Sequence, residues 1–346
     1  MMDAFARRRL GRSTLEVTQL GFGGASLGDA YEVIPEAQAE GALEAAFAAG
    51  IGHFDTSPWY GNGKSEMRFG RVLRTKPRAS FALTTKIGRV YFRPKEPDTF
   101  FHERWVGGLP FDRRFDYTRE GVLRSYEQSL LRLGLNRIDG LLIHDLDLRH
   151  QLTDEGIAAR MKELEDGKGW QALADLKASG EIRAIGAGIN HLGMIPRFLK
   201  RFDIDFFLLA MPYTLMEQEA LDEELPLCQE RGVSIVLGAP YASGILARGP
   251  RPGAMYGYKP AEPHIIAKAE KIAAVCARHG VPLAAAAVQF PLAHPVVASV
   301  IPGPVSAEEV RLNFAAMRYP IPDALWDELK HDGLIRADAP TPKAGA

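Results

Sequence analysis

The stretch His53-Phe-Asp-Thr-Ser-Pro-Trp-Tyr-Gly61 begins with a short apolar run and carries two polar residues, Asp55 and Tyr60, at its end and just past it. A run of this length that leads into a turn is typical of a buried β-strand. In parallel barrels the active-site residues lie at such carboxyl ends, because the loops that follow the strands gather on one face. The stretch therefore predicts one barrel strand with two candidate functional residues at its mouth.

Two later stretches repeat this arrangement. Lys86 lies near the end of Phe81-Ala-Leu-Thr-Thr-Lys-Ile87, and His144 ends the apolar run that begins at Gly140. Carboxyl ends of parallel strands meet on one face, so side chains far apart in the chain are expected to share one site. The candidate catalytic residues are Asp55, Tyr60, Lys86 and His144.

Short apolar runs alternate with amphipathic stretches of helical period along most of the chain, as in an α/β fold. Eight strand-then-helix units can be counted, which fits a (β/α)8 TIM barrel. Before the first unit, Arg7–Val17 is expected to form an N-terminal β-hairpin that plugs the barrel. The strands are expected at Leu20–Gly23, Gly52–Thr56, Phe81–Ile87, Gly140–His144, Ala184–Ile189, Phe206–Met211, Ser234–Ala239 and Val297–Ile301.

No internal repeat or low-complexity linker divides the 346 residues, so a single domain over 1–346 is expected, with its core at about 10–319. The longest irregular segment, 88–117, follows the third strand and is rich in arginine and aromatic residues. Because this strand carries Lys86, the segment is expected to form an active-site loop. The tail over 337–346, rich in proline and alanine, is expected to be flexible.

Three aromatic residues are candidate substrate contacts: Trp59, which is adjacent to Tyr60, and Tyr91 and Trp105 in the 88–117 segment. A flat indole ring can stack on a sugar or pyridine ring, and loop aromatics can close a pocket against water. The simpler interpretation of each is a packing residue, because large aromatic side chains are buried in most proteins.

Composition excludes several classes of partner. Lys and Arg number 42 and Asp and Glu number 43, so there is no overall field to recruit nucleic acid or an anionic membrane. The two cysteines, Cys228 and Cys276, indicate neither a disulfide framework nor a zinc site. No signal peptide or membrane-spanning run is present in the sequence. We expect a cytoplasmic protein with a small-molecule substrate, and self-association stays open.

The four candidate residues suit proton transfer. A phenol has a pKa of about 10 in water, and a nearby ammonium lowers that value by favouring the phenolate. Lys86 is suited to this role, and Asp55 can balance its charge when both are buried. His144 can hydrogen-bond a substrate oxygen and orient it. None of these groups carries a hydride, so redox chemistry at this site requires a cofactor.

These residues resemble the aldo-keto reductase superfamily from about Leu10 to Tyr319. The stretch Phe54–Gly61, continued by Gly-Asn-Gly-Lys-Ser-Glu66, is similar to the superfamily signature, and the strand end Ile301-Pro-Gly303 matches as well. Within the superfamily the chain looks most like bacterial NAD-dependent L-fucose or D-threo-aldose 1-dehydrogenases and pyridoxal 4-dehydrogenase. The resemblance implies a dehydrogenase that acts on CH–OH donors.

The resemblance also implies a nicotinamide site. Asn190 matches the asparagine that holds the carboxamide of the nicotinamide, and Tyr241 matches the aromatic residue that stacks on the nicotinamide ring. Ala210 takes the place of a glutamine of the superfamily. NADP-dependent members place a lysine near Gly303 and an arginine near Glu309, and neither is present here, so the resemblance predicts NAD over NADP. Arg311, two residues away, is the nearest alternative phosphate ligand. The implied cofactor residues are Asn190, Tyr241, Ile301, Gly303, Ser306, Glu309 and Asn313.

The predicted reaction is oxidation of the anomeric carbon of a sugar to a lactone by hydride transfer to NAD. Pyridoxal 4-dehydrogenation and general aldehyde or ketone reduction are alternatives within the superfamily. From other classes, Lys86 could form a Schiff base as in an aldolase, or the barrel could be a regulatory subunit with little turnover. No metal site is predicted, because His53 and Asp55 lack enough convergent ligands.

Overall fold

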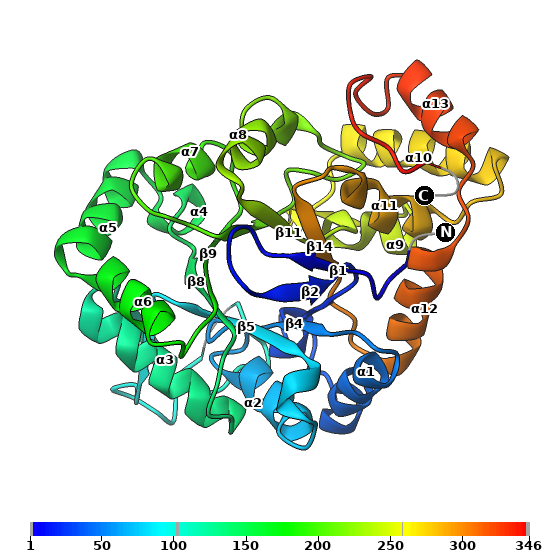
Figure 1. The fold of residues 1–346 in the computed structure, drawn as a ribbon. Coiled ribbons are helices and arrows are strands. Elements are labelled where there is room, and N and C mark those ends of the chain that lie inside the picture. The colour runs from blue at the N-terminus through cyan, green and yellow to red at the C-terminus, as the bar shows by residue number, and fades with distance from the viewer. Residues whose placement is uncertain (1–2, 102–103, 258, 344–346) are drawn as a thin grey trace.

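The computed structural model describes residues 3–101, 104–257 and 259–343. An eight-stranded parallel sheet lies at the centre, and each strand pairs with the next one along the barrel (Figure 1). The first and last strands meet where Leu20 bridges Val300, and Gly21 N–H donates to the Val300 carbonyl over 2.9 Å. The barrel strands are β3 (Phe22–Gly23), β4 (His53–Asp55), β5 (Ala82–Ile87), β8 (Gly140–His144), β9 (Ala184–Ile189), β10 (Phe206–Ala210), β11 (Ser234–Gly238) and β14 (Val297–Ile301).

The predicted (β/α)8 barrel is confirmed, and three of the eight strands have the predicted bounds: β8, β9 and β14. The first strand differs most, because β3 covers only two residues and Leu20 contributes a single bridge. Strands with regular pairing on both sides, such as β8, keep the full length of their apolar run.

Helices surround the sheet. The helix after 88–117 begins at Thr118, whose side chain accepts a hydrogen bond from the Gly121 N–H, and it ends at Gly134 in the left-handed conformation, as its sequence predicts. The helices are α1 (Glu36–Ala48), α2 (Lys64–Leu73), α3 (Arg119–Leu133), α4 (Leu148–Gln151), α5 (Asp154–Asp166), α6 (Gly169–Ala178), α7 (Met194–Leu199), α8 (Glu224–Arg231), α9 (Ile245–Arg248), α10 (Pro263–Arg278), α11 (Leu283–Gln289), α12 (Ala307–Arg318) and α13 (Asp323–His331).

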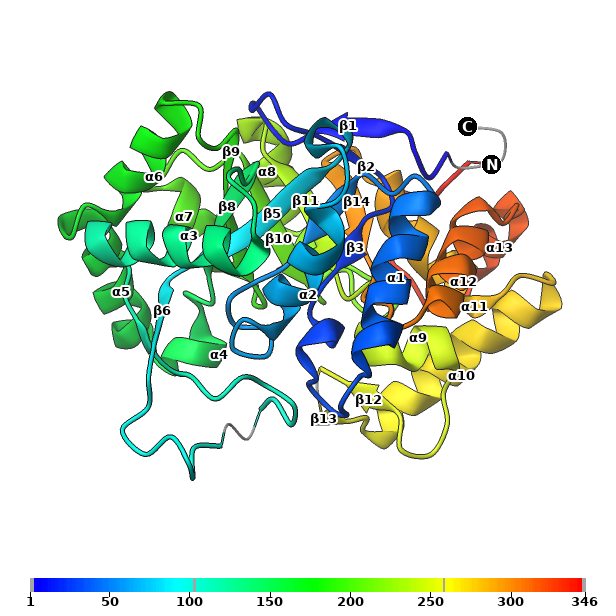
Figure 2. The same cartoon turned by 90° about the horizontal axis from the view of Figure 1, so that it is seen from below.

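The predicted N-terminal hairpin is present. Its strands, β1 (Arg7–Arg9) and β2 (Glu16–Thr18), pair antiparallel across the amino end of the barrel (Figures 1 and 2). Leu10, Leu15 and Val17 are fully buried in one cluster with side chains from inside the barrel. The hairpin therefore closes this end with apolar contacts, and the opposite end remains for a ligand site.

The described parts of the 88–117 segment, 88–101 and 104–117, lie at that opposite end, away from the hairpin (Figure 2). The two ends of the segment form an antiparallel pair, β6 (Arg89–Phe92) and β7 (Asp112–Phe115). A second short pair, β12 (Met255–Tyr256) and β13 (Lys259–Pro260), lies at the same end of the molecule.

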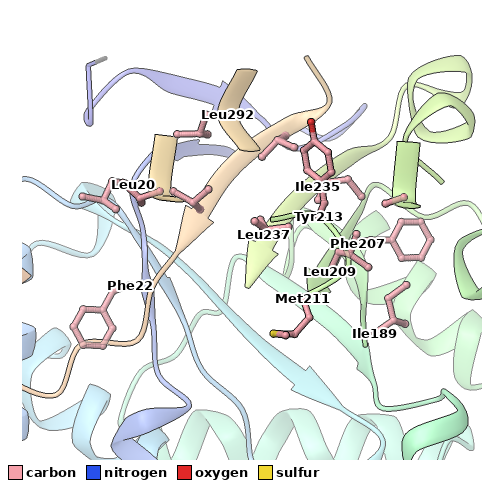
Figure 3. Close-up of a cluster of buried hydrophobic side chains, with 14 of the residues drawn as sticks. Leu20, Phe22, Ile189, Phe207, Leu209, Met211, Tyr213, Ile235, Leu237 and Leu292 are labelled. Atoms are coloured by element: carbon pink, nitrogen blue, oxygen red, sulfur yellow. The ribbon is translucent and has the colours of Figure 1, made fainter. Parts of the chain in front are cut away.

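Alternation along the strands divides the core into two layers. In β10, Phe207 and Leu209 belong to the larger cluster toward the helices (Figure 3). Phe206 and Leu208, which alternate with them, belong to the cluster inside the barrel. Among the described residues no single helix is long and apolar enough to cross a membrane. One pair, Pro263–Arg278 with Leu283–Ala293, meets that length and composition only together and is bent by 103°.

Candidate functional site

A buried ion pair lies at the carboxyl ends of β4 and β5. The Nζ atom of Lys86 lies 2.6 Å from Oδ1 of Asp55 and donates to the Thr56 carbonyl over 2.7 Å. The other carboxylate oxygen of Asp55 accepts from the Thr84 hydroxyl over 2.7 Å. Burial raises the pKa of Asp55, and the Lys86 ammonium opposes this by favouring the carboxylate. Complete hydrogen bonding is what makes such a pair tolerable in an interior.

Tyr60 lies beside this pair. The Lys86 ammonium is 4.8 Å from the centre of the Tyr60 ring, and a positive charge at that range favours the phenolate over the phenol. The next residue, Gly61, has a φ of 67°, which suits glycine. A side chain on Gly28 would place its Cβ only 2.6 Å from the Gly61 nitrogen, so the loop after β3 packs directly on the backbone that carries Tyr60.

The Gly61–Glu66 part of the signature braces that loop. Asp29 is held by the Nζ of Lys64 and by the guanidinium of Arg68, each over 2.6 Å. The Ser65 N–H donates to the Tyr60 carbonyl over 3.2 Å, and the Ser65 hydroxyl donates to Gly24 over 2.8 Å. These contacts join the loop after β3 to the start of α2, and they position Tyr60 between the two.

His144 is held as a neutral imidazole. Its Nδ1 lies 3.1 Å from the Ser57 hydroxyl and 3.3 Å from a guanidinium nitrogen of Arg89. A guanidinium can only donate, so Nδ1 accepts and the ring proton resides on Nε2. Burial, with the Lys86 and Arg89 charges, lowers the pKa of His144 well below its usual value. The imidazole can therefore donate from Nε2 to a substrate oxygen without carrying a charge.

Arg89 is a residue of the site whose role was not predicted from the sequence. Its guanidinium pairs with Asp145 over 2.7 Å and packs between the rings of Trp59 and Phe115, at 4.6 and 4.5 Å. Its position three residues beyond Lys86, directly after Gly88, is a first sequence signal that could have indicated it. The adjacency of Asp145 to His144 is a second such signal.

A cavity of about 510 Å³ opens above these residues, a size typical of small-molecule sites. Its floor is open because β9 carries Gly188, where a Cβ would lie 3.3 Å from Cδ2 of His144. The lining residues are Ala25, Trp59, Tyr60, Lys86, Arg104, Trp105, Arg113, His144, Asp145, Arg149, His150, Gly188, Ile189, Asn190, Leu208 and Ala210.

Asn190 lines the same cavity and is oriented by Asp147. Its backbone N–H and its side-chain amide both donate to Oδ2 of Asp147 over 2.9 Å. Burial would raise the pKa of Asp147, but hydrogen bonds from His150 and Asn190 outweigh it and lower the pKa to about 2. Asp145, Asp147 and His150 place one ligand atom each within 4.8 Å of one another, although Asp145 already pairs with Arg89.

The predicted adenosine-side residues lie along β14 and α12. Ser306 caps α12 by accepting from the Glu309 N–H over 3.2 Å, and Glu309 in turn accepts from the Val305 N–H over 2.8 Å. The Tyr241 hydroxyl donates to Oδ1 of Asn313 over 2.8 Å, which joins the loop after β11 to α12. Arg248 on α9 lies 3.4 Å from Glu309. The sequence did not indicate that this arginine lies near Glu309, because the two residues are far apart along the chain.

These features fit a nicotinamide cofactor. A Cβ on Gly303 would lie 2.8 Å from the Ser26 hydroxyl and 3.2 Å from the Gly23 carbonyl, so the exit of β14 stays in close contact with the loop after β3. Small side chains at Gly188 and Ala210 leave room for a planar ring beside the oriented Asn190 amide. Asn190 and Tyr241 would hold the nicotinamide end, and Ser306, Glu309 and Asn313 the adenosine end.

Six of the fourteen predicted site residues line one cavity, and the predicted cofactor residues other than Asn190 do not line it. Tyr60, Lys86, His144, Trp59, Trp105 and Asn190 line it, and Asp55 contacts it through Lys86. Tyr91 does not line the cavity. Its backbone exchanges hydrogen bonds with the Gln128 side chain over 3.2 and 3.0 Å, and its ring lies 5.6 Å from the Arg132 guanidinium, so it is buried against α3.

The chain is similar in sequence and in structure to known proteins. The sequence pattern described as the aldo/keto reductase family matches residues 19–331. A pyridoxal 4-dehydrogenase from Microbacterium luteolum is 38% identical over 96% of this chain and 99% of its own. A D-threo-aldose 1-dehydrogenase from Pseudomonas sp. is 37% identical over 95% and 96%. The solved holo form of an aldo-keto reductase from Bacillus halodurans has a TM-score of 0.73 at 27% identity, covering 97% of this chain and 98% of that one.

Proposed function

The chain belongs to the aldo/keto reductase family and is an oxidoreductase, and from this premise we propose that it oxidises the anomeric carbon of an aldose hemiacetal to a lactone with NAD. The observation that carries the proposal is the Lys86 ammonium, held by Asp55 at 2.6 Å and placed 4.8 Å from the Tyr60 ring. The name of the D-threo-aldose relative supports a sugar as the substrate.

The proton leaves through Tyr60. As the anomeric O–H bond breaks, the phenolate oxygen takes the proton, and the Lys86 charge stabilises that phenolate beforehand. The electron pair of the O–H bond forms the C=O bond of the lactone, and the anomeric hydrogen departs with its own electron pair. The nicotinamide of bound NAD supplies the acceptor for that hydride. Asp55 holds the Lys86 side chain in place beside Tyr60, because its carboxylate oxygen lies 2.6 Å from Nζ.

His144 positions the reacting oxygen. With its proton on Nε2, the neutral imidazole donates a hydrogen bond to the substrate oxygen while Arg89 and Ser57 occupy Nδ1. A neutral donor does not compete for the proton that Tyr60 removes. Trp59 and Trp105, whose rings meet edge to face at 80° with centres 5.4 Å apart, line the cavity and provide apolar contacts for the sugar.

Glu309 supports NAD over NADP. A carboxylate at the adenosine end repels a 2′-phosphate but can accept a hydrogen bond from a ribose hydroxyl. The Arg248 guanidinium, 3.4 Å from Glu309 and 60% exposed, offsets that charge only weakly because solvent screens such pairs. Arg311, the alternative phosphate ligand, is held by Glu308 over 3.0 Å on the exposed face of α12.

A second candidate is the oxidation of pyridoxal, which also reacts as a cyclic hemiacetal to give a lactone. The name of the pyridoxal 4-dehydrogenase relative favours it, and the aromatic Trp59 lines the cavity that would hold the pyridine ring. Schiff-base chemistry is disfavoured. Lys86 is 1% exposed, and its Nζ donates hydrogen bonds to both Asp55 and the Thr56 carbonyl, so it is poorly placed to attack a carbonyl carbon.

A spectrophotometric screen for reduced cofactor tests the proposal. NAD and NADP are each supplied with L-fucose, D-arabinose, L-galactose and pyridoxal, and Tyr60→Phe is the matched blank. We expect turnover of a hemiacetal with NAD, a loss of about a thousandfold in Tyr60→Phe, and retained cofactor binding by fluorescence titration. Turnover that survives in Tyr60→Phe would refute the role of Tyr60, and turnover with NADP alone would refute the cofactor preference.

A further inference from the structure

The cavity carries more positive charge than its reaction centre uses. At the floor of the cavity, the charge of Lys86 is balanced by Asp55 at 2.6 Å, and the charge of Arg89 is balanced by Asp145 at 2.7 Å. On the side formed by the 88–117 segment, Arg113 also lines the cavity. Its charge has no role in the proposed chemistry.

Arg113 lies in β7, directly opposite Tyr91 of β6. Its guanidinium packs over the Trp59 ring at 4.3 Å and is partly buried. Across residues 3–101, 104–257 and 259–343, its side chain has neither a carboxylate within ion-pair distance nor a hydrogen-bond acceptor. The adjacent Asp112 instead accepts from the backbone N–H of Arg113 over 2.7 Å.

A second guanidinium lies against the same indole. Arg89 is 4.6 Å from the Trp59 ring centre, so two positive charges share one aromatic side chain, and only Arg89 has a counter-charge in contact. Burial, followed by repulsion from Arg89, lowers the pKa of Arg113. Placing a partly desolvated cation beside another is unfavourable unless an anion compensates it. The cavity is where such an anion has access to Arg113.

We propose that Arg113 binds an anionic group of the substrate, a carboxylate or a phosphate, at the end of the molecule remote from the carbon that reacts at Tyr60. This inference rests on the proposed function and narrows its substrate class to hemiacetals or aldehydes that carry a negative charge. A guanidinium presents two parallel N–H donors, which match the paired oxygens of both anions. The Trp59 ring holds the guanidinium plane and leaves those donors for the ligand.

Matched substrate pairs test this in the reductive direction with NADH. One pair is 4-carboxybenzaldehyde and its methyl ester, and the other is pyridoxal 5′-phosphate and pyridoxal. In Arg113→Gln the ratio of kcat/KM for the charged member to that for the neutral member is expected to fall about tenfold, the effect of losing one charge-assisted hydrogen bond. The pair with the larger fall identifies carboxylate or phosphate as the preferred anion. Arg114→Gln is the control, because this neighbour is exposed and pairs with Asp116, and its ratio should not change.

An equal fall for both members, or an unchanged ratio in Arg113→Gln, would overturn the inference. Tryptophan fluorescence decides the matter separately from turnover, because the Trp59 ring contacts Arg113. Benzoate and inorganic phosphate are titrated at constant ionic strength, with chloride as reference. Saturable quenching that weakens about tenfold in Arg113→Gln supports the anion site even when wild-type protein reduces neither aldehyde, a result that would count against the proposed function alone. Quenching that is equal in both proteins counts against the site.

Discussion

The guanidinium of Arg89 lies 3.3 Å from Nδ1 of His144, and this contact decides which imidazole nitrogen carries the proton. Because arginine has donors only, Nδ1 must accept and Nε2 must be protonated. The first residue of β6 thereby sets the protonation pattern of a residue at the end of β8. Neither stretch of sequence contains this relationship by itself.

Nitrogen NMR of histidine-labelled protein should report this tautomer directly. His144 is expected to remain neutral with its proton on Nε2 from about pH 8 to pH 5, because burial and the nearby Lys86 and Arg89 charges lower its pKa well below the usual value. Exposed histidines in the same spectrum supply the titrating reference. A protonated Nδ1, or an imidazolium at pH 6, would contradict the assignment.

Replacing Lys86 should change the pH dependence of the reaction. In Lys86→Met the phenolate of Tyr60 loses its stabilising charge, so kcat near pH 7 should fall about a hundredfold or more and recover partly as pH rises toward 10. The profile of kcat against pH is the measurement. The double variant Asp55→Asn, Lys86→Met removes the uncompensated carboxylate and controls for loss of stability. A profile parallel to that of the wild type would show that Lys86 does not act on Tyr60.

Cofactor choice should shift when Glu309 is neutralised. In Glu309→Gln the repulsion of a 2′-phosphate is removed and Arg248 is released, so the ratio of kcat/KM with NADP to that with NAD should rise about tenfold. Glu230→Gln, an exposed glutamate on α8, is the control for a change in net charge. If the ratio is the same in both variants, Glu309 does not select the cofactor.

Buried histidines should make the protein less stable in mild acid. His53 is fully buried between Ser299 and Thr84, and burial, then the Lys86 charge, lower its pKa to about 3. At a pH below about 6.5, the usual pKa of histidine, the unfolded chain binds a proton at this residue that the folded chain does not bind. The free energy of unfolding therefore decreases as the pH is lowered, by up to about 1.4 kcal/mol per pH unit for each such group.

Urea unfolding at pH 7 and pH 5.5 measures this effect. The loss of stability between these pH values should be smaller in His53→Gln than in the wild type, because one buried group no longer titrates in the unfolded chain. His294, whose pKa burial lowers to about 4, continues to contribute in both proteins. An identical pH dependence in the variant would show that His53 does not stay neutral in the fold.

The local sequence was sufficient to predict the barrel architecture. Apolar runs of strand length, such as Gly140–His144 and Val297–Ile301, keep their predicted bounds because a buried parallel strand needs little more than apolar side chains and neighbours on both sides. Thr118 and Gly134 cap the two ends of α3, and both are residue types that favour those positions, since capping acts within one helical turn. The barrel also explains why Lys86 and His144 share a cavity, because the carboxyl ends of its strands lie at one face regardless of the conformation of the loops.

The contacts between loops could not be predicted from the sequence and are known only from the tertiary structure. The 88–117 segment folds back as the β6 and β7 pair, which places Arg89 and Arg113 against Trp59 and buries Tyr91 toward α3. No periodicity specifies such a pairing, because irregular segments take their conformation from the surfaces they pack against. The chain by itself determined the barrel and the four polar residues at its mouth. The tertiary structure decided which of the surrounding side chains face the cavity, since that depends on contacts between residues distant in sequence.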